Sequence, residues 1–206
     1  MARPNQSDDR RRELIPIVAR TFAELGYRRT TTAELAQRCG VRENILYRLW
    51  SDKKAMFIAS IDYVYELSAT IWGRLLAEGD GQCSAAARLL EYESTHHGEF
   101  GLFRIVFAGL SETDDPDIRA ALGEMYRRYH RFIQGRITEH RGSTADAAAM
   151  DAALTAWAVI GLGTVANIGR ELDLLDEDAR KLLLGTVGGS LLGGTGETTS
   201  KETETT

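Results

Sequence analysis

Cysteine is scarce in this sequence, and the two cysteines lie far apart. Cys39 and Cys83 belong to no CxxC pair and to no cysteine-histidine spacing that binds zinc. We therefore expect neither a disulfide framework nor a zinc site, and a reducing cytoplasm is the favoured location. No apolar stretch follows Arg10, Arg11 and Arg12, so no signal peptide is expected.

Strand-like alternation of apolar and polar residues is also nearly absent. The chain has 206 residues, 43% of them hydrophobic, which is enough for one or two compact domains.

Residues 1–54 contain twelve Lys and Arg against seven Asp and Glu, whereas the rest contains thirteen against twenty-three. The basic segment can bind a polyanion although the net charge is -5, because local charge steers phosphate binding. A chance cluster of surface arginines is the alternative.

Helical periodicity dominates the N-terminal segment. The apolar residues of a first helix recur at every third or fourth position: Leu14, Ile17, Val18, Phe22 and Leu25. Gly26 supplies a C-terminal stop. Because Pro16 lacks a backbone N–H, the regular helix begins either near residue 13 or at Ser7 with a kink.

Two short helices follow, joined by a turn that contains glycine. Thr31 and Glu34 have the spacing of a capping box, and Gly40 ends the first short helix. Helices this short are not stable alone, so they must pack on their neighbours. Ala36 lies four residues before Gly40 and Leu46 six residues after it, which is the spacing of a helix-turn-helix.

The outer side of the second short helix carries groups that can read DNA bases. Its exposed positions are Glu43, Asn44, Tyr47 and Arg48. Arg, Asn and Glu side chains form hydrogen bonds with base edges in the major groove. Lys53 and Lys54 at the start of the next helix are placed to meet phosphates. The alternative is that these polar residues are only solvated.

Residues 12–57 resemble the N-terminal domain of TetR-family transcriptional regulators. The similar pieces are "VARTFAELGYRRTTTAELAQRCGV", "NILYRLW" and "SDKKAMF", and residues 102–122 resemble segments of the family's ligand domains. The resemblance implies that Thr32, Tyr47 and Lys53 hold phosphates. It also implies which residues lie near bases, namely Arg42, Glu43, Asn44 and Arg48.

Two positions depart from the family's pattern. Asn44 stands where a glycine or another small residue is frequent, and Glu43 puts an acid in a helix that faces DNA. The family's base contacts therefore cannot be copied directly. Glu43 either reads a base or holds Arg42 or Arg48 in place.

The remaining residues predict a larger helical domain. Its helices are expected at 53–78, 83–97, 99–111, 116–141, 145–171 and 176–192, and Asp115-Pro116-Asp117 is a clear helix start. The predicted fold is all-α, with a three-helix DNA-binding domain in residues 1–54. An effector-binding and dimerisation domain follows in residues 55–193, and residues 194–206 are expected to form a flexible tail.

Two stretches of this larger domain are uncharged. They are residues 152–169 and the glycine-rich residues 182–194. A helix that is apolar all round is buried on all sides, so two such helices per chain suggest a four-helix interface in a homodimer. Burial in a single core is one alternative. A membrane span is another, but the glycines, threonines and asparagine disfavour it.

Aromatic residues concentrate in the middle helices, where filling a core is the default interpretation. In TetR-like regulators the equivalent bundle commonly encloses an effector pocket, so the resemblance implies a small, mostly apolar ligand. The candidate contacts are Trp72, Tyr92, His96, Phe103, Phe107 and Tyr126. Glu93 and His96 form one ExxH motif, but a di-iron bundle needs two, so neither a metal nor a cofactor is expected.

Two classes of function remain open. The first is a cytoplasmic, homodimeric, sequence-specific repressor that binds a palindromic double-stranded DNA operator and leaves it when a small apolar effector binds. The second is a helical enzyme or small-molecule carrier in which the N-terminal helices are only a scaffold. The sequence shows no nucleophile with a base, no P-loop and no dinucleotide fingerprint, which favours the regulator.

Overall fold

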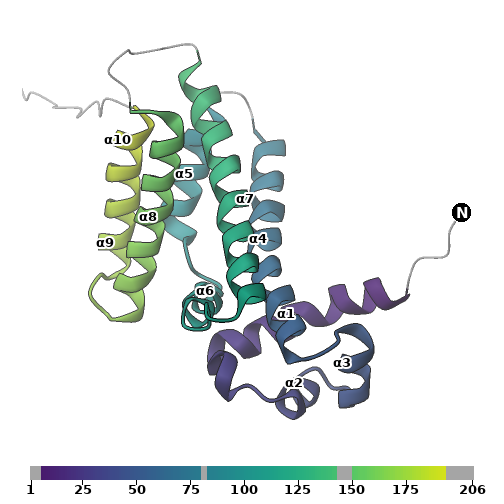
Figure 1. Cartoon of the computed structure of the whole chain (residues 1–206). Coiled ribbons are helices and arrows are strands. Elements are labelled where there is room, and N and C mark those ends of the chain that lie inside the picture. Colours follow the sequence, from purple (N-terminus) through teal and green to yellow (C-terminus); the bar gives the residue numbers. More distant parts are fainter. Residues whose placement is uncertain (1–5, 80–82, 143–149, 194–206) are drawn as a thin grey trace, which may run out of the picture. The chain divides into compact units, whose positions relative to one another are not determined.

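The computed structural model describes residues 6–79, 83–142 and 150–193, and every regular element in these ranges is helical. The elements are α1 (Gln6–Arg29), α2 (Thr32–Arg38), α3 (Glu43–Leu49), α4 (Lys53–Ala77), α5 (Ala85–His96), α6 (Phe103–Leu110), α7 (Pro116–Arg141), α8 (Ala152–Glu171), α9 (Glu177–Leu182), the π-helical turn η1 (Leu183–Val187) and α10 (Gly188–Leu192) (Figure 1). The predicted all-α fold is confirmed. The predicted tail, residues 194–206, lies outside the described residues.

Local sequence explains where several helices begin and end. The Thr31 hydroxyl accepts a hydrogen bond of 3.1 Å from the Glu34 N–H and caps α2. Asp115 caps α7, because its carboxylate accepts from the Asp117 N–H at 2.9 Å. Gly40 has a φ of 63°, a backbone conformation that favours glycine, so the turn between α2 and α3 depends on this residue.

The first helix starts at the earlier of the two predicted positions. It begins at Gln6 and passes through Pro16. Non-helical dihedral angles inside α1 occur at Gly26, with a φ of 75°, and not at the proline. The predicted stop at Gly26 is therefore a break, after which the chain makes one further turn to Arg29.

The first of two compact units comprises Met1–Ala77 and Gly98–Tyr129. It contains the helix-turn-helix, α4, α6 and the first half of α7. One hydrophobic core runs through these helices, and its most deeply buried large residues are Val18, Phe22, Leu35, Leu46, Met56, Phe57, Ile61, Ile105, Ile118 and Met125. The helix-turn-helix therefore shares its core with α6 and α7, beyond the predicted boundary at residue 54.

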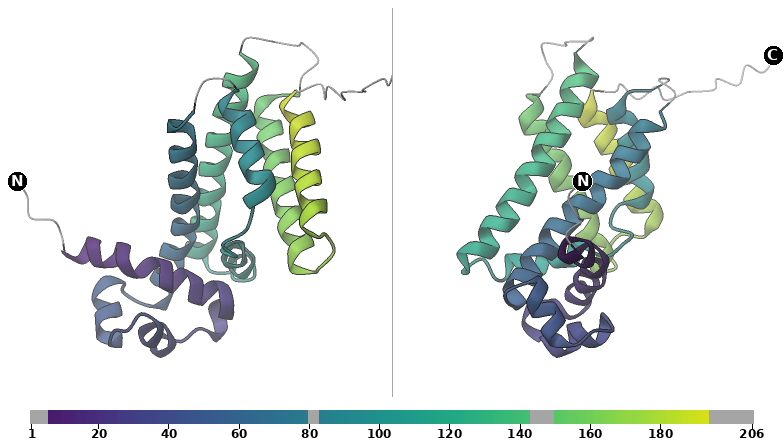
Figure 2. Two further views of the ribbon diagram at one scale, coloured as in Figure 1. Left: turned by 180° about the vertical axis from the view of Figure 1, so that it is seen from behind. Right: turned by 90° about the vertical axis from the view of Figure 1, so that its right-hand side faces the viewer.

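The second unit comprises Glu78–His97 and His130–Thr206. Within it, α8 lies beside the continuous segment formed by α9, η1 and α10, as the two views of Figure 2 show. Small residues permit close approach of these helices. A Cβ added at Gly188 would lie 2.4 Å from Leu90 Cδ1, so α10 packs tightly on α5 at this glycine.

Candidate nucleic-acid interface

The inner side of α3 is fixed in the core of the first unit. Leu46 is fully buried and Leu49 is 6% exposed. Arg11 of α1 adds a polar anchor, because its Nε donates to the Leu49 carbonyl oxygen at 2.7 Å. This bond satisfies one of the carbonyl groups that the end of a helix leaves without a partner. The orientation of α3 is therefore set by packing and by α1.

The outer side of α3 is open to solvent. Arg42, Asn44 and Arg48 are exposed, and within the described chain their side chains form no hydrogen bond or ion pair. A guanidinium has five N–H donors, and an amide has both donors and an acceptor. These three predicted base-reading residues are therefore available to an external partner.

The other predicted contacts on α2 and α3 are joined to one another. The Thr32 hydroxyl donates to Glu43 Oε2 at 2.7 Å, and the Tyr47 hydroxyl donates to Thr32 Oγ1 at 3.2 Å. Glu43 thus bonds to α2 rather than to Arg42 or Arg48, to which no contact joins it in the described chain.

Lys53 connects the start of α4 to the last turn of α1 and to the residue that follows it. Its Nζ donates to the carbonyl oxygens of Tyr27 and Thr30, both at 3.1 Å, and lies 4.5 Å from the centroid of the Tyr27 ring. An ammonium group has three donors, so these two bonds leave one N–H of Lys53 for a further acceptor.

Lys54 has a different environment from Lys53. Its Nζ lies 2.6 Å from the Asp117 carboxylate and 3.2 Å from that of Asp115. Hydrogen bonds to Asp117 and then to Asp115 raise the pKa of Lys54 above its ordinary value. Its charge is therefore matched by two carboxylates, and the phosphate contact of Lys54 stays a prediction.

Two residues that position this interface were missed by sequence reasoning. Tyr27 holds Lys53, and Arg11 holds the end of α3. Their partners are 26 and 38 residues away in the sequence, so no local spacing connects them. The sequence offers one signal for Tyr27: it directly follows Gly26, where the backbone of α1 leaves the helical conformation.

The predicted effector contacts belong to both units. Those in the first unit are Trp72, Phe103, Phe107 and Tyr126. The Trp72 ring lies 5.7 Å from that of Tyr129, and the rings of Phe103 and Phe107 are also 5.7 Å apart, both pairs edge to face. Tyr92 and His96 belong to the second unit and stack on each other, with ring centroids 4.5 Å apart.

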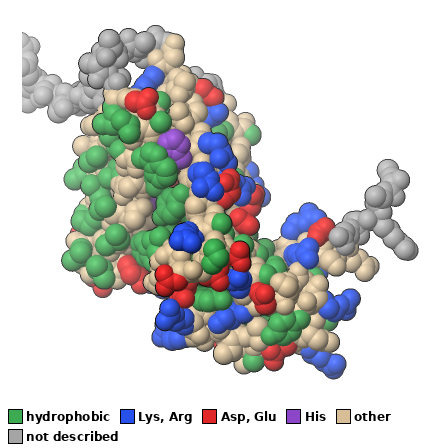
Figure 3. All heavy atoms as spheres, viewed as in Figure 1, with side chains coloured by type: hydrophobic (Ala, Val, Ile, Leu, Met, Phe, Trp, Pro, Cys, Tyr) green, Lys and Arg blue, Asp and Glu red, His purple; other side chains and the backbone are tan. Residues whose placement is uncertain are grey.

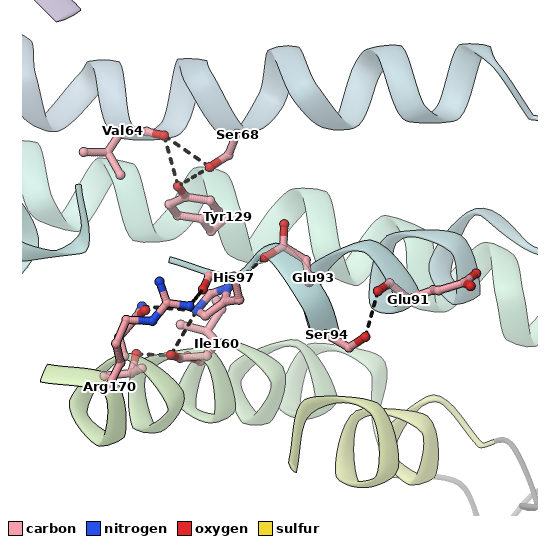
Figure 4. Close-up of polar contacts among 12 residues, drawn as sticks. Val64, Ser68, Glu91, Glu93, Ser94, His97, Tyr129, Ile160 and Arg170 are labelled. Atoms are coloured by element: carbon pink, nitrogen blue, oxygen red, sulfur yellow. Dashed lines mark hydrogen bonds and ion pairs between the residues drawn. The ribbon is translucent and has the colours of Figure 1, made fainter. Parts of the chain in front are cut away.

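In the second unit the next histidine, His97, joins a partly buried polar network. Its Nδ1 lies 2.7 Å from the Glu93 carboxylate (Figure 4). Its Nε2 lies 3.0 Å from the Gly163 carbonyl oxygen. Nε2 is also 3.1 Å from the amide nitrogen of Asn167, a residue that is only 8% exposed. Arg170 donates to the His97 carbonyl oxygen at 2.6 Å. These contacts join the end of α5 to α8.

The other side of α8 exposes large apolar residues near both of its ends, with Gly161 between the two groups. These residues, called the α8 stripe below, are Leu154, Trp157, Val165, Ile168 and the C-cap residue Leu172. Figure 3 shows hydrophobic side chains gathered over α8 to α10. By length and composition α8 is also apolar enough to cross a membrane, a test that core helices of soluble proteins pass as well.

Comparisons with known proteins agree with this geometry. Residues 19–60 match the family of bacterial regulatory proteins, tetR family. Over 128 residues the chain is 27% identical to the nucleoid occlusion factor SlmA of Pasteurella multocida (strain Pm70), and the aligned part covers 58% of this chain and 61% of that protein.

Two solved structures have the same fold. One is a transcriptional regulator of the TetR family from Cytophaga hutchinsonii, with a TM-score of 0.75, 19% identity, and coverage of 94% of this chain and 98% of that chain. The other is AibR in complex with isovaleryl coenzyme A and operator DNA, with a TM-score of 0.63, 15% identity, and coverage of 89% and 98%. The family match includes the helix-turn-helix, and the shared fold extends over most of the chain. Residues 19–60 therefore match the DNA-binding domain of the tetR family of bacterial regulatory proteins, and the chain shares the fold of solved TetR-family regulators.

Proposed function

We propose that the protein is a repressor that binds a palindromic operator as a homodimer and leaves it when a small, mostly apolar effector binds. The observation that carries this proposal is the outer side of α3. Its Arg42, Asn44 and Arg48 side chains have no polar partner in the described chain, although the helix itself is firmly anchored. Arginine pairs bidentately with guanine, and asparagine with adenine, so this surface suits the major groove.

The α8 stripe supports the homodimer. Leu154 is 61% exposed, Trp157 48% and Val165 52%, which is unusual for large apolar residues on one helix of a soluble chain. A second copy related by a twofold axis would cover the stripe with the same surface. Such a dimer would present two α3 helices and would therefore match a palindromic operator.

The effector is supported by aromatic residues of the first unit. Tyr65, Trp72 and Tyr129 pack edge to face, and Ser68 Oγ lies 3.0 Å from the Tyr129 hydroxyl (Figure 4). Apolar rings with a few hydroxyl groups suit a mostly apolar ligand. The similar protein AibR has been solved with isovaleryl coenzyme A, which carries an apolar acyl group.

Gel retardation of the DNA upstream of the protein's own gene tests the proposal. The full chain should retard this DNA, and Arg48→Ala should weaken retardation because it removes a base-reading side chain. Arg74→Ala is the matched control, since Arg74 is an exposed arginine near the end of α4. Equal retardation by both variants would remove α3 from the interface, and release by small apolar compounds would support the effector.

A further inference from the structure

The hydroxyl groups of Thr32 and Tyr47 each donate a hydrogen bond within the protein. A hydroxyl has a single O–H donor. That of Tyr47 goes to Thr32 Oγ1, and that of Thr32 goes to Glu43 Oε2. In this arrangement neither hydroxyl has a proton left for a DNA phosphate.

The bond between Thr32 and Glu43 is the stronger of the two. Its length of 2.7 Å is at the long end of the range typical of a hydroxyl that donates to a carboxylate, a bond stronger than one between neutral groups. A phosphate that approached Thr32 would meet the negative charge of Glu43 and would have to break this bond. Both effects oppose a phosphate contact at Thr32.

The bond with Thr32 uses only one of the two carboxylate oxygens of Glu43. A carboxylate has two oxygens, and Oε2 is the one that accepts from Thr32. Glu43 is exposed in the first turn of α3, beside Asn44. Its Oε1 has no partner within the described chain. An external donor can therefore reach this oxygen.

We propose that Thr32 is a positioning residue for Glu43, and that Glu43 determines specificity by accepting a hydrogen bond from a cytosine amino group in the major groove. Glutamate is an acceptor that matches the cytosine N4 amino group. Thr32 fixes the carboxylate, and Tyr47 supports Thr32 by donating to its oxygen. This inference rests on the proposed function and assigns one base pair per half-site to Glu43.

The proposal differs in its consequences from a phosphate contact at Thr32. Loss of a phosphate contact weakens binding to all sequences about equally. Loss of a residue that positions a base-reading side chain alters the preference at one base pair and leaves the others unchanged. The decisive readout is therefore base preference rather than affinity.

Selection of binding sites from random DNA by the full chain tests the proposal. Wild type, Glu43→Gln, Thr32→Val and the double variant are compared, with Thr32→Ser as the matched control that keeps the hydroxyl. Glu43→Gln and Thr32→Val should both relax the preference for cytosine at the same position of each half-site, by about 5- to 150-fold. The double variant should relax it no further, and Thr32→Ser should retain it.

An unchanged motif for Thr32→Val, with weaker binding to every sequence, would overturn the proposal and make Thr32 a phosphate ligand. An unchanged motif for Glu43→Gln would overturn it as well. Failure of the wild type to enrich any motif would instead contradict the proposed function, so the two failures are distinguishable.

Discussion

Gly163 shows how one missing methyl group allows two helices to meet. A Cβ at this position would lie 2.9 Å from both Cε1 and Nε2 of the His97 ring. The ring is held by Glu93 and Asn167, so it cannot move away without losing these bonds. The close approach of α8 to the end of α5 therefore depends on this glycine.

We expect Gly163→Ala to lower the free energy of unfolding by about 1–3 kcal/mol, because overpacking displaces the ring. Gly73→Ala is the control, since Gly73 lies inside α4 with nothing within 4 Å of an added Cβ. That variant should raise the free energy of unfolding by roughly 0.5–1 kcal/mol, because alanine favours the helix. Urea denaturation measures both, and similar changes in the two variants would contradict the account of Gly163.

The neighbouring lysines should contribute differently to DNA binding. Lys53→Met removes an ammonium with one unused donor, so the slope of log affinity against log salt should fall by about one unit per subunit. Lys54→Met removes a charge that Asp115 and Asp117 already match, so its slope should change less. Titrations of labelled operator at several salt concentrations measure both slopes. Equal slopes for the two variants would contradict the prediction that Lys53 contributes more than Lys54 to phosphate binding.

At the scale of elements, the start of α7 contacts the start of α4 through charge. Partial burial raises the pKa of Asp115, but the N–H of Ile118 and then Lys54 outweigh it, so the pKa lies below its ordinary value. A carboxyl group with a lowered pKa in the folded state stabilises the fold above its unfolded pKa. This contribution is lost as the pH falls through the folded pKa.

Asp115→Asn should therefore lower the melting temperature at neutral pH, because the ion pair with Lys54 is lost. Asparagine also caps helices well, so the cap of α7 is retained. The difference from wild type should shrink as the pH falls below about 4, where aspartates become protonated. Melting curves over a pH series measure this, and a difference that is independent of pH would show that the charge of Asp115 does not matter.

Local sequence predicted α7 well because the signals at its start are local, whereas α8 begins at Ala152 and not at the predicted residue 145. The predicted range 116–141 is that of α7, since a capping aspartate and a proline mark its start. The shared core was not predictable in this way, because Phe57 and Ile105 come together only through long-range packing. The same holds for the site. Periodicity identified Arg48 as outward, whereas the bond between Thr32 and Glu43 depends on how α2 meets α3.

At the scale of the whole molecule, the proposed homodimer would cover the exposed α8 stripe. A charged substitution in one of the two uncharged stretches would test the dimer, but not every position suits it. An arginine at Gly188 or Leu162 would also disturb the single chain, because Gly188 packs against Leu90 and Leu162 is half-buried. Val165 is a better position, since it is 52% exposed in the middle of the stripe.

Val165→Arg should yield a monomer, because a dimer would bury two unpaired charges. Thr138→Arg is the control, since Thr138 is exposed on α7 outside the stripe. Sedimentation of the full chain at micromolar concentration should show a dimer for wild type and for Thr138→Arg. A wild-type monomer, or a dimeric Val165→Arg variant, would contradict the proposed interface.

The central claim is that the outer side of α3 reads a specific DNA sequence. Fluorescence anisotropy tests it most directly, with the full chain, an operator recovered by selection and a scrambled duplex of equal length and composition, all at physiological salt. We expect the operator to bind at least about 10³-fold more tightly than the scrambled duplex. Arg48→Ala should reduce this ratio, and Arg74→Ala should leave it unchanged. Equal affinity of the wild type for the two duplexes would contradict the claim.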